Sequence, residues 1–418
     1  MNSFLILFTS EFPYGRGEAY LESEIKYLAA AFSKIVIVSN AEQPSDIRIL
    51  PSNVEVLTRP YGLSPLQKLL SFGMIFKADF WKELLFVKSQ YKLPLNTTVV
   101  NTILLSLFKS YQVERFLIDK LTPILDTGNT LCYSYWADDN AVSLALMNSR
   151  GYRFKSICRT HRWDVYFEKN GSGYLPFRKA LADNLSAIYF VAQNGLDYFK
   201  AKTGLNLDKL QLARLGTYPL LGCELSDKIY DLHLLSCSFV IDRKRVHKIA
   251  EALQLVQLDI RVKWTHIGSG PGIDKLRQLC QDICRMNPNI SIELPGTMPN
   301  ASVKDFYSKN YVDLFINVSE SEGVPVSIME AMSAGVPCLA TDVDGVSEIV
   351  RDGINGFLLP LSDDSKVISN ALKRFYELTP NQKGSLRKGA FKTWEQDYNA
   401  DKNYEAFIRS ITAPINRV

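Results

Sequence analysis

The sequence contains no run of about 18 uncharged apolar residues, and no basic segment precedes the short apolar stretch near its start, Phe4–Phe8. The first absence predicts that no helix spans a membrane, and the second predicts that no signal peptide directs secretion. Internal repeats and low-complexity segments are missing too, and 46% hydrophobic beside 22% charged residues is typical of globular proteins. We therefore expect the 418 residues to fold as two or three domains in the cytoplasm.

Cysteine and histidine are scarce, with seven and four copies. An odd number of cysteines scattered over a long chain indicates reduced thiols rather than a disulfide framework. Cys280 and Cys284 would share a helix face, but no cluster of other Cys or His accompanies them. We therefore interpret both as core residues and predict no metal site there.

A large excess of charge is also absent, because the formal net charge is only +4. Nucleic acid is therefore not expected as a partner, and no nucleic-acid-binding motif is present. Positive charge does gather at residues 59–115, where eight Lys and Arg face three Asp and Glu among many aromatic side chains. Two interpretations stay open: a helical stretch that lies on an anionic membrane surface, or an ordinary amphipathic helix that faces its own core.

Short apolar runs alternate with longer helical patterns along the chain, which is typical of parallel sheets covered by helices. Two such series, separated at 216–231, predict an α/β protein with two doubly wound, Rossmann-like domains. We expect domains at 1–222 and 223–395 and a helix at 396–418 that packs back on the first domain. Ligands bind beyond the carboxyl ends of such strands, which would be the cleft between the domains. The runs are Phe4–Phe8, Ile35–Val38, Leu131–Tyr133, Ile188–Val191, Leu212–Ala213, Leu234–Phe239, Val262–Ile267, Ile290–Leu294, Leu314–Val318 and Cys338–Ala340.

The most informative segment, residues 318–341, is predicted to run from a buried strand through a turn and a short helix into the next strand. Pro325 suits the first helical position, and the unpaired N–H groups of the first turn suit an anion, above all phosphate. Glu322 and Glu330 flank this helix start. Spacing alone leaves two interpretations open: carboxylates that accept from adjacent sugar hydroxyls, or charges that only complement the helix dipole and face solvent.

The segment resembles the signature of retaining glycosyltransferases of family four, which have the GT-B fold. That signature is a Glu, seven residues, a second Glu, and then Ala-Met-Ala/Ser-x-Gly-x-Pro, and the match continues through residues 344–356. The resemblance implies that Glu330 binds the ribose of a nucleotide sugar and that Glu322 contacts the transferred sugar. It also implies that sugar and phosphate are held by the backbone of Gly323, Val324, Pro325 and Val326.

Upstream positions complete the donor site that this resemblance implies. Lys244 matches a lysine on the donor diphosphate, whereas Phe239 stands where the family has an arginine, and Arg243 or Arg245 is a candidate for the missing charge. Gly268, in a Gly-x-Gly-Pro sequence, would leave room for the nucleotide. The base would be held by the loop of Gly296, Thr297 and Met298.

In the first half, the resemblance implies a glycine loop that closes over donor phosphate and acceptor. Its residues are Gly15, Arg16 and Gly17. The sequence Arg159-Thr-His161-Arg-Trp-Asp164 resembles the family's Arg-x-His-x-x-Asp, so His161 would point into the cleft near the anomeric carbon, with Arg159 and Asp164 beside it.

The expected activity is the transfer of a sugar from a nucleotide diphosphate sugar to a hydroxyl of a glycan or lipid-linked glycan, with retention of anomeric configuration. Glu322, His161 and Lys244 would be catalytic, and no metal ion is expected, because Lys244 and backbone amides would stabilise the leaving group. Bacterial surface polysaccharide or lipopolysaccharide synthesis at the inner face of the plasma membrane is implied by resemblance alone. Another GT-B enzyme, an epimerase or phosphorylase, and a catalytically silent homologue in a polysaccharide assembly complex remain alternatives.

Overall fold

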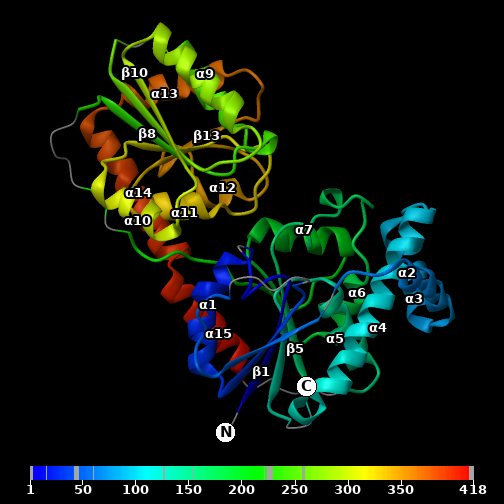
Figure 1. The fold of residues 1–418 in the computed structure, drawn as a ribbon. Helices are drawn as coiled ribbons and strands as arrows, with labels where there is room; N and C mark the ends of the chain where they lie inside the picture. The colour runs from blue at the N-terminus through cyan, green and yellow to red at the C-terminus, as the bar shows by residue number, and fades with distance from the viewer. Residues whose placement is uncertain are drawn as a thin grey trace. The chain divides into compact units, whose positions relative to one another are not determined.

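The computed structural model describes residues 3–15, 17–41, 47–59, 61–125, 128–152, 154–220, 222–223, 229–256 and 259–413 (Figure 1). The chain divides into two compact units, one of Met1–Arg214 with Tyr404–Val418 and the other of Leu215–Asn403. These boundaries differ from those expected at 222 and 395. Thr217 belongs with the second unit because its side chain accepts a hydrogen bond from the Trp394 indole at 3.0 Å.

The first unit is built on a parallel sheet of seven strands in the order β3-β2-β1-β4-β5-β6-β7. Its strands are β1 (Phe4–Thr9), β2 (Lys34–Ser39), β3 (Val54–Thr58), β4 (Thr130–Ser134), β5 (Lys155–Thr160), β6 (Ala187–Phe190) and β7 (Leu210–Leu212). Its helices are α1 (Ala19–Ala31), α2 (Pro65–Leu70), α3 (Ala78–Phe86), α4 (Thr97–Leu125), α5 (Asp139–Ser149), α6 (Arg178–Asn184) and α7 (Gln193–Thr203), with short turns η1 (Ser71–Phe76), η2 (Val87–Tyr91) and η3 (Phe167–Lys169).

Both faces of this sheet are covered, which explains why its central strands are almost continuously apolar. Alternate side chains of β1 enter two cores: Ile6 packs in the cluster that includes α4 and α5, and Leu7 packs with α1. Phe407 and Ile411 of α15 (Ala400–Thr412) join the second of these cores. The last helix therefore completes the hydrophobic cover of the first sheet.

The second unit has six parallel strands in the order β10-β9-β8-β11-β12-β13. They are β8 (Leu232–Cys237), β9 (Val262–Ile267), β10 (Ile290–Gly296), β11 (Leu314–Asn317), β12 (Cys338–Thr341) and β13 (Gly356–Leu359). The helices are α8 (Val246–Leu255), α9 (Ile273–Met286), α10 (Asn300–Lys309), α11 (Val326–Ser333), α12 (Val346–Ile349), α13 (Lys366–Tyr376) and α14 (Pro380–Asp397), with η4 (Asp242–Lys244) before α8. Cys280 lies buried in this core, as expected.

The segment from α2 to α3 buries little of its apolar surface. Within α2 no residue is buried, and within α3 only Phe80 and Glu83 are. Its exposed side chains, here called the apolar face, are Leu66, Leu69, Leu70, Phe72, Ile75, Phe76, Trp81 and Leu85. The segment is therefore not an amphipathic helix that turns its apolar side to its own core. Among the described residues, no helix combines the length and hydrophobicity that a membrane span requires.

Candidate active site

The start of α11 lies just beyond the carboxyl end of β11, as the sequence predicts. Pro325 is the N-cap residue, one position before the first helical position predicted for it, and it has an extended backbone conformation. Its carbonyl accepts from the N–H groups of Ile328 and Met329. The N–H groups that precede Ile328 in the first turn have no partner within the helix, because a helix offers them none. This end of the sheet therefore presents backbone donors and the positive end of a helix dipole.

Glu322 is held beside this helix start by three side-chain donors. Its Oε1 accepts from Lys244 Nζ in an ion pair, from Ser319 Oγ at 2.6 Å and from Asn317 Nδ2 at 3.3 Å. The side chains of Glu322 and Lys244 are 9% and 16% exposed. Two residues that the sequence analysis assigns to the donor site, Glu322 and Lys244, are therefore in direct contact. Sequence reasoning missed Asn317 and Ser319, although polar residues at the end of an apolar strand were a signal for this edge of the sheet.

Glu330 is buried within α11, so it is not a surface residue. Asn300 Nδ2 donates to its Oε1 at 3.2 Å. Burial raises the pKa of the Glu330 carboxyl, and the hydrogen bond from Asn300 and the charge of Lys304 lower it to a smaller extent. A buried carboxylate with one side-chain donor keeps acceptor capacity for hydroxyl groups of a ligand.

The basic residues around η4 separate into different roles. Arg243 is exposed, and its backbone carbonyl accepts from the Glu320 N–H at 2.8 Å. Arg245 is buried, donates to the Ser362 carbonyl and pairs with Asp363. The expectation that Arg243 or Arg245 replaces the family's arginine on a diphosphate stays a prediction, and Arg245 would have to exchange these partners for the ligand. Phe239 is 68% exposed at that family position.

The glycines of the segment after β9 serve the packing of two loops. A Cβ on Gly268 would lie 1.9 Å from the Ser238 carbonyl oxygen, and one on Gly270 would lie 2.6 Å from that of Val240. These contacts explain why both positions lack a side chain, and the role of Gly268 in making room for a nucleotide stays a prediction. A Cβ on Gly296 would meet nothing within 4 Å, and Thr297 and Met298 follow it in the loop that leads to α10.

Asp342 and Asp344 have the Asp-x-Asp spacing that metal-dependent sugar transferases typically use, a feature that the expectation of a metal-free site overlooked. Asp342 is exposed. The Asp344 carboxylate accepts from Ser321 Oγ and from the Glu322 N–H at 3.0 Å, so it supports the loop that carries Glu322. No group of three or more His, Cys, Asp or Glu is placed to hold a metal ion within the described ranges.

In the first unit, carboxylates organise the loop between β1 and α1. Glu18 accepts from the N–H groups of Ser10, Glu11 and Phe12 at 2.7–2.8 Å and from the Trp136 indole at 2.6 Å. Sequence reasoning singled out the glycines of this loop and missed Glu18.

The same loop explains Gly15 and Gly17. Gly15 has a φ of +61°, and a Cβ on Gly17 would lie 2.6 Å from the Glu11 carboxylate. Arg48 donates to both glycine carbonyls, at 2.9 and 2.8 Å. The predicted role of Arg16 lies outside the described residues.

Arg159 and Asp164 hold the first unit together instead of facing a ligand. Arg159 is 0% exposed, pairs with Glu24 at 2.5 Å and donates to the Ala213 carbonyl at 2.7 Å. Asp164 is also buried, and its carboxylate accepts from the N–H groups of Ala137, His161 and Arg162. The expectation that these two side chains bind acceptor or phosphate is wrong, because neither offers the exposed surface that such contact requires.

His161 follows β5 and is packed between two aromatic rings. Its ring centroid lies 4.5 Å from that of Tyr135 and 4.4 Å from that of Trp136. Both ring nitrogens are buried and have no hydrogen-bond partner among the described residues. Burial, together with the charge of Arg159, holds the pKa of His161 well below its usual range. The imidazole is therefore neutral, and one of its two buried nitrogens carries a hydrogen.

Two parallel sheets, each wound with helices, define the GT-B fold, which confirms the expected fold class. The chain is similar to a lipopolysaccharide outer core galactosyltransferase, WaaB, with a TM-score of 0.65 and 12% identity over 98% of this chain and 99% of that one. It is equally similar to Anabaena HepE in complex with UDP and glucose, with a TM-score of 0.65 and 17% identity over 99% and 100%. At such identities these likenesses show the fold alone.

Residues 232–392, which include Lys244, Glu322 and Glu330, match the family model described as glycosyl transferases group 1. A putative colanic acid biosynthesis glycosyltransferase, WcaL of Escherichia coli, is 28% identical over 173 residues. That alignment covers 40% of this chain and 42% of the relative. The sequence match thus spans about two fifths of the curated relative.

Proposed function

We propose that this protein transfers a sugar from a nucleotide diphosphate sugar to a hydroxyl acceptor in the synthesis of a bacterial surface polysaccharide or lipopolysaccharide. The observation that carries the proposal is the meeting of Lys244 and Glu322 beside the first turn of α11. The match of residues 232–392 to glycosyl transferases group 1 supports it, as does the colanic acid biosynthesis named for the relative. The second unit would bind the donor and the first unit the acceptor.

Lys244 and the first-turn N–H groups would stabilise the charge that grows on the leaving diphosphate. The bond between the anomeric carbon and the diphosphate oxygen breaks, the acceptor oxygen bonds to that carbon, and a phosphate oxygen takes the acceptor proton on the same face. Retention of configuration follows from that geometry. Since Glu322 Oε1 already accepts from three side chains, Glu322 positions the sugar rather than attacking it. His161 would donate a hydrogen bond near the anomeric carbon, and no metal ion takes part in this proposal.

A calorimetric screen with UDP-, GDP-, ADP- and dTDP-sugars tests the donor site. Lys244→Met should weaken binding of the matching nucleotide diphosphate about 10- to 100-fold, since a charge-assisted hydrogen bond is worth about 1.5–3 kcal/mol. Lys248→Met is the matched control, because Lys248 also pairs with a glutamate, Glu251, at 2.9 Å on neighbouring α8. Unchanged affinity in Lys244→Met would remove this lysine from the site.

One feature favours a second candidate, a catalytically silent partner in polysaccharide assembly. Phe239 stands where the family has an arginine, and the Arg245 guanidinium contacts the Ser362 carbonyl and Asp363. If no nucleotide sugar binds in the screen, the silent partner is supported and the transferase is contradicted. Conversion of a bound donor to another sugar nucleotide without any acceptor would instead identify an epimerase.

We further propose that the apolar face docks on the anionic cytoplasmic surface of a membrane. Phe76 is 89% exposed, and Lys68, Lys77 and Lys82 lie in the same segment. Figure 1 shows α2 and α3 outside α4, at the periphery of the first unit. Apolar rings enter the boundary between headgroups and acyl chains while lysines meet anionic lipids. The combination of exposed rings and lysines therefore fits a lipid surface.

Sedimentation with vesicles that contain phosphatidylglycerol tests this docking. Wild-type protein should sediment with them and not with phosphatidylcholine vesicles. The triple variant Phe72→Ser, Phe76→Ser, Trp81→Ser should remain in the supernatant. A control that changes exposed apolar residues elsewhere, Met286→Ser with Phe391→Ser, should sediment as wild type does. Equal sedimentation of the triple variant would reject the membrane contact.

A further inference from the structure

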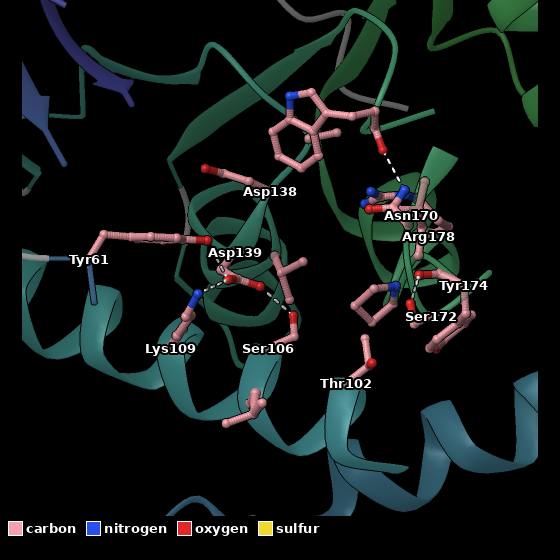
Figure 2. A pocket seen from close by; sticks show the side chains of 16 residues that line it. Tyr61, Thr102, Ser106, Lys109, Asp138, Asp139, Asn170, Ser172, Tyr174 and Arg178 are labelled. Carbon is pink, nitrogen blue, oxygen red and sulfur yellow. Dashed lines mark hydrogen bonds and ion pairs between the residues drawn. The ribbon is translucent and has the colours of Figure 1, made fainter. Parts of the chain in front are cut away.

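The first unit contains a cavity of about 240 Å³ that the donor chemistry does not use. Its walls come from α4, from the loop that leads β4 into α5, and from the segment 170–178. Figure 2 shows Asp139, Ser106 and Lys109 on one side and Ser172 and Tyr174 on the other, with Thr102 between them. Ligand pockets for drug-sized molecules hold about 300–1,000 Å³, so this cavity suits a ligand of one ring.

The polar wall offers mainly acceptors. Ser172 Oγ donates its own hydrogen to the Tyr174 carbonyl at 2.9 Å, and Thr102 Oγ1 donates to the Thr98 carbonyl at 2.8 Å. Each of these oxygens therefore faces the cavity as an acceptor. Asp138 adds a carboxyl to the same wall. A wall of this kind pairs with ligand groups that donate, as sugar hydroxyls do.

The formal charges of the wall balance. Lys109 Nζ lies 3.6 Å from Asp139 Oδ2 and 3.9 Å from the Tyr61 ring centroid. Arg178 is buried and donates to the Asp164 carbonyl at 3.1 Å. Lys109 is paired with Asp139, and the formal charge of Arg178 is balanced by that of Asp138, so the wall carries no net charge that would attract a ligand anion. The cavity therefore fits an uncharged ligand.

An aromatic platform completes the cavity. Trp163 lines it and is 40% exposed. The ring is braced from behind by Trp136, at 5.3 Å between centroids and 31° between planes. The apolar face of a pyranose has C–H groups that pack on such a ring, while its hydroxyls reach the polar wall.

We propose that this cavity binds one neutral hexopyranose unit of the acceptor glycan. The role of this sugar as the acceptor rests on the proposed function, whereas the binding of a neutral sugar in the cavity does not depend on it. Phosphorylated or uronic acid sugars would bind more weakly, because Lys109 is already paired with Asp139 and the wall has no net formal charge to offset theirs.

Ligand-observed NMR titrations with methyl glycosides of glucose, galactose, mannose and N-acetylglucosamine test the proposal. At least one of them should bind saturably to the full chain, and glucose 6-phosphate and methyl glucuronoside should bind at least tenfold more weakly. Thr102→Trp, which fills the cavity, should weaken the neutral glycoside at least tenfold. Lys120→Trp on the exposed side of the same helix should bind as wild type does.

Ser172→Trp fills the cavity from the opposite wall and gives a second, independent blocking variant. If no neutral glycoside binds, if the anionic sugars bind as tightly, or if both blocking variants bind as wild type does, the proposal is overturned. Nucleotide diphosphate affinity, measured on the same samples, should be unchanged in both variants. Should the glycoside bind at this cavity while no nucleotide binds to any sample, the sugar site stands and the proposed transferase falls.

Discussion

Two ion pairs, one in each unit, differ in what surrounds them. Lys244 and Glu322 in the second unit keep 16% and 9% of their side chains exposed, beside backbone donors of α11. Arg159 and Glu24 in the first unit are both 0% exposed. Arg159 also lies 4.5 Å from the Phe407 ring centroid of α15. The first pair faces a place for a ligand, whereas the second ties β5 and α1 to the last helix.

The difference teaches that a charged residue near a strand end is not by itself a sign of a binding site. The two charges of a buried ion pair have lost their hydration and are stabilised by each other. Removal of one partner therefore leaves the other charge buried without compensation. A pair that keeps some exposure and further hydrogen-bond donors can exchange one partner for a ligand at lower cost, because the remaining charge keeps other partners. Loss of the cation should therefore destabilise the protein much more at Arg159 than at Lys244.

The largest expected effect is on stability. Arg159→Met should cost about 3–5 kcal/mol because it leaves Glu24 buried without its partner. For a unit of this size that loss lowers the melting temperature by about 10 °C. Lys244→Met should cost less, about 1–3 kcal/mol, because Glu322 keeps hydrogen bonds from Ser319 and Asn317. Differential scanning calorimetry of both variants measures the contrast.

Glu24→Gln with Arg159→Met, which removes both charges, is the control and should restore part of the loss. Equal melting temperatures for Arg159→Met and Lys244→Met would show that burial does not separate the two pairs.

The apolar runs of the sequence predicted most of the strands. Every apolar run taken as a strand lies in or overlaps one, because buried parallel strands are nearly continuous in hydrophobic residues. The runs omitted β3, β5 and the short β13, Gly356–Leu359. In β3, Val54–Thr58, side chains alternate with Glu55 and lie at the sheet edge. In β5, Lys155 and Arg159 interrupt the apolar pattern.

Glu322 and Glu330 were predictable because they stand in one segment of the chain, whereas Lys244, 78 residues from Glu322, was assigned by resemblance. The first unit's network was not predictable, because its members come from distant segments: Glu18 meets Trp136, and Glu24 meets Arg159. The spacing of residues within one segment does not predict contacts between segments that are far apart in the sequence. Arg159 was therefore assigned to a ligand by resemblance, and only its burial showed the ion pair.

A smaller effect should separate the two glutamates of the second unit. Glu322→Gln should lower turnover about 100-fold with little change in donor affinity, because Glu322 acts on the sugar in the transition state. Glu330→Gln should weaken nucleotide affinity about tenfold, since it loses a charged hydrogen bond. Steady-state kinetics and calorimetry on both variants make the comparison, and Asp342→Asn, at an exposed carboxylate, is the control.

The raised pKa of Glu330 adds a pH test. Nucleotide affinity should fall as the pH drops through that pKa, because the protonated carboxyl accepts hydrogen bonds less well, and Glu330→Gln should lose this dependence. Identical kinetic profiles for the two variants would contradict the separate assignments.

The smallest expected effect concerns Asp138, which lies in the first unit at the N-terminus of α5. Burial, and then the charge of Asp139, raise its pKa to about 7, whereas an unfolded aspartate titrates near 3.9. Between these values the folded protein holds a proton that the unfolded chain has lost. The stability contributed by that proton is present at low pH and is lost as the pH rises toward 7.

Asp138→Asn cannot ionise, so its free energy of unfolding should fall less than that of wild type from pH 5 to pH 7. We expect a difference of about 1 kcal/mol, because solvent at this partly exposed side chain screens part of the full value. Asparagine keeps the N-cap oxygen that accepts from the Asn140 N–H at 2.9 Å, so the helix start is preserved. Parallel pH profiles of wild type and variant would show that the protonation of Asp138 does not contribute to the pH dependence of the free energy of unfolding.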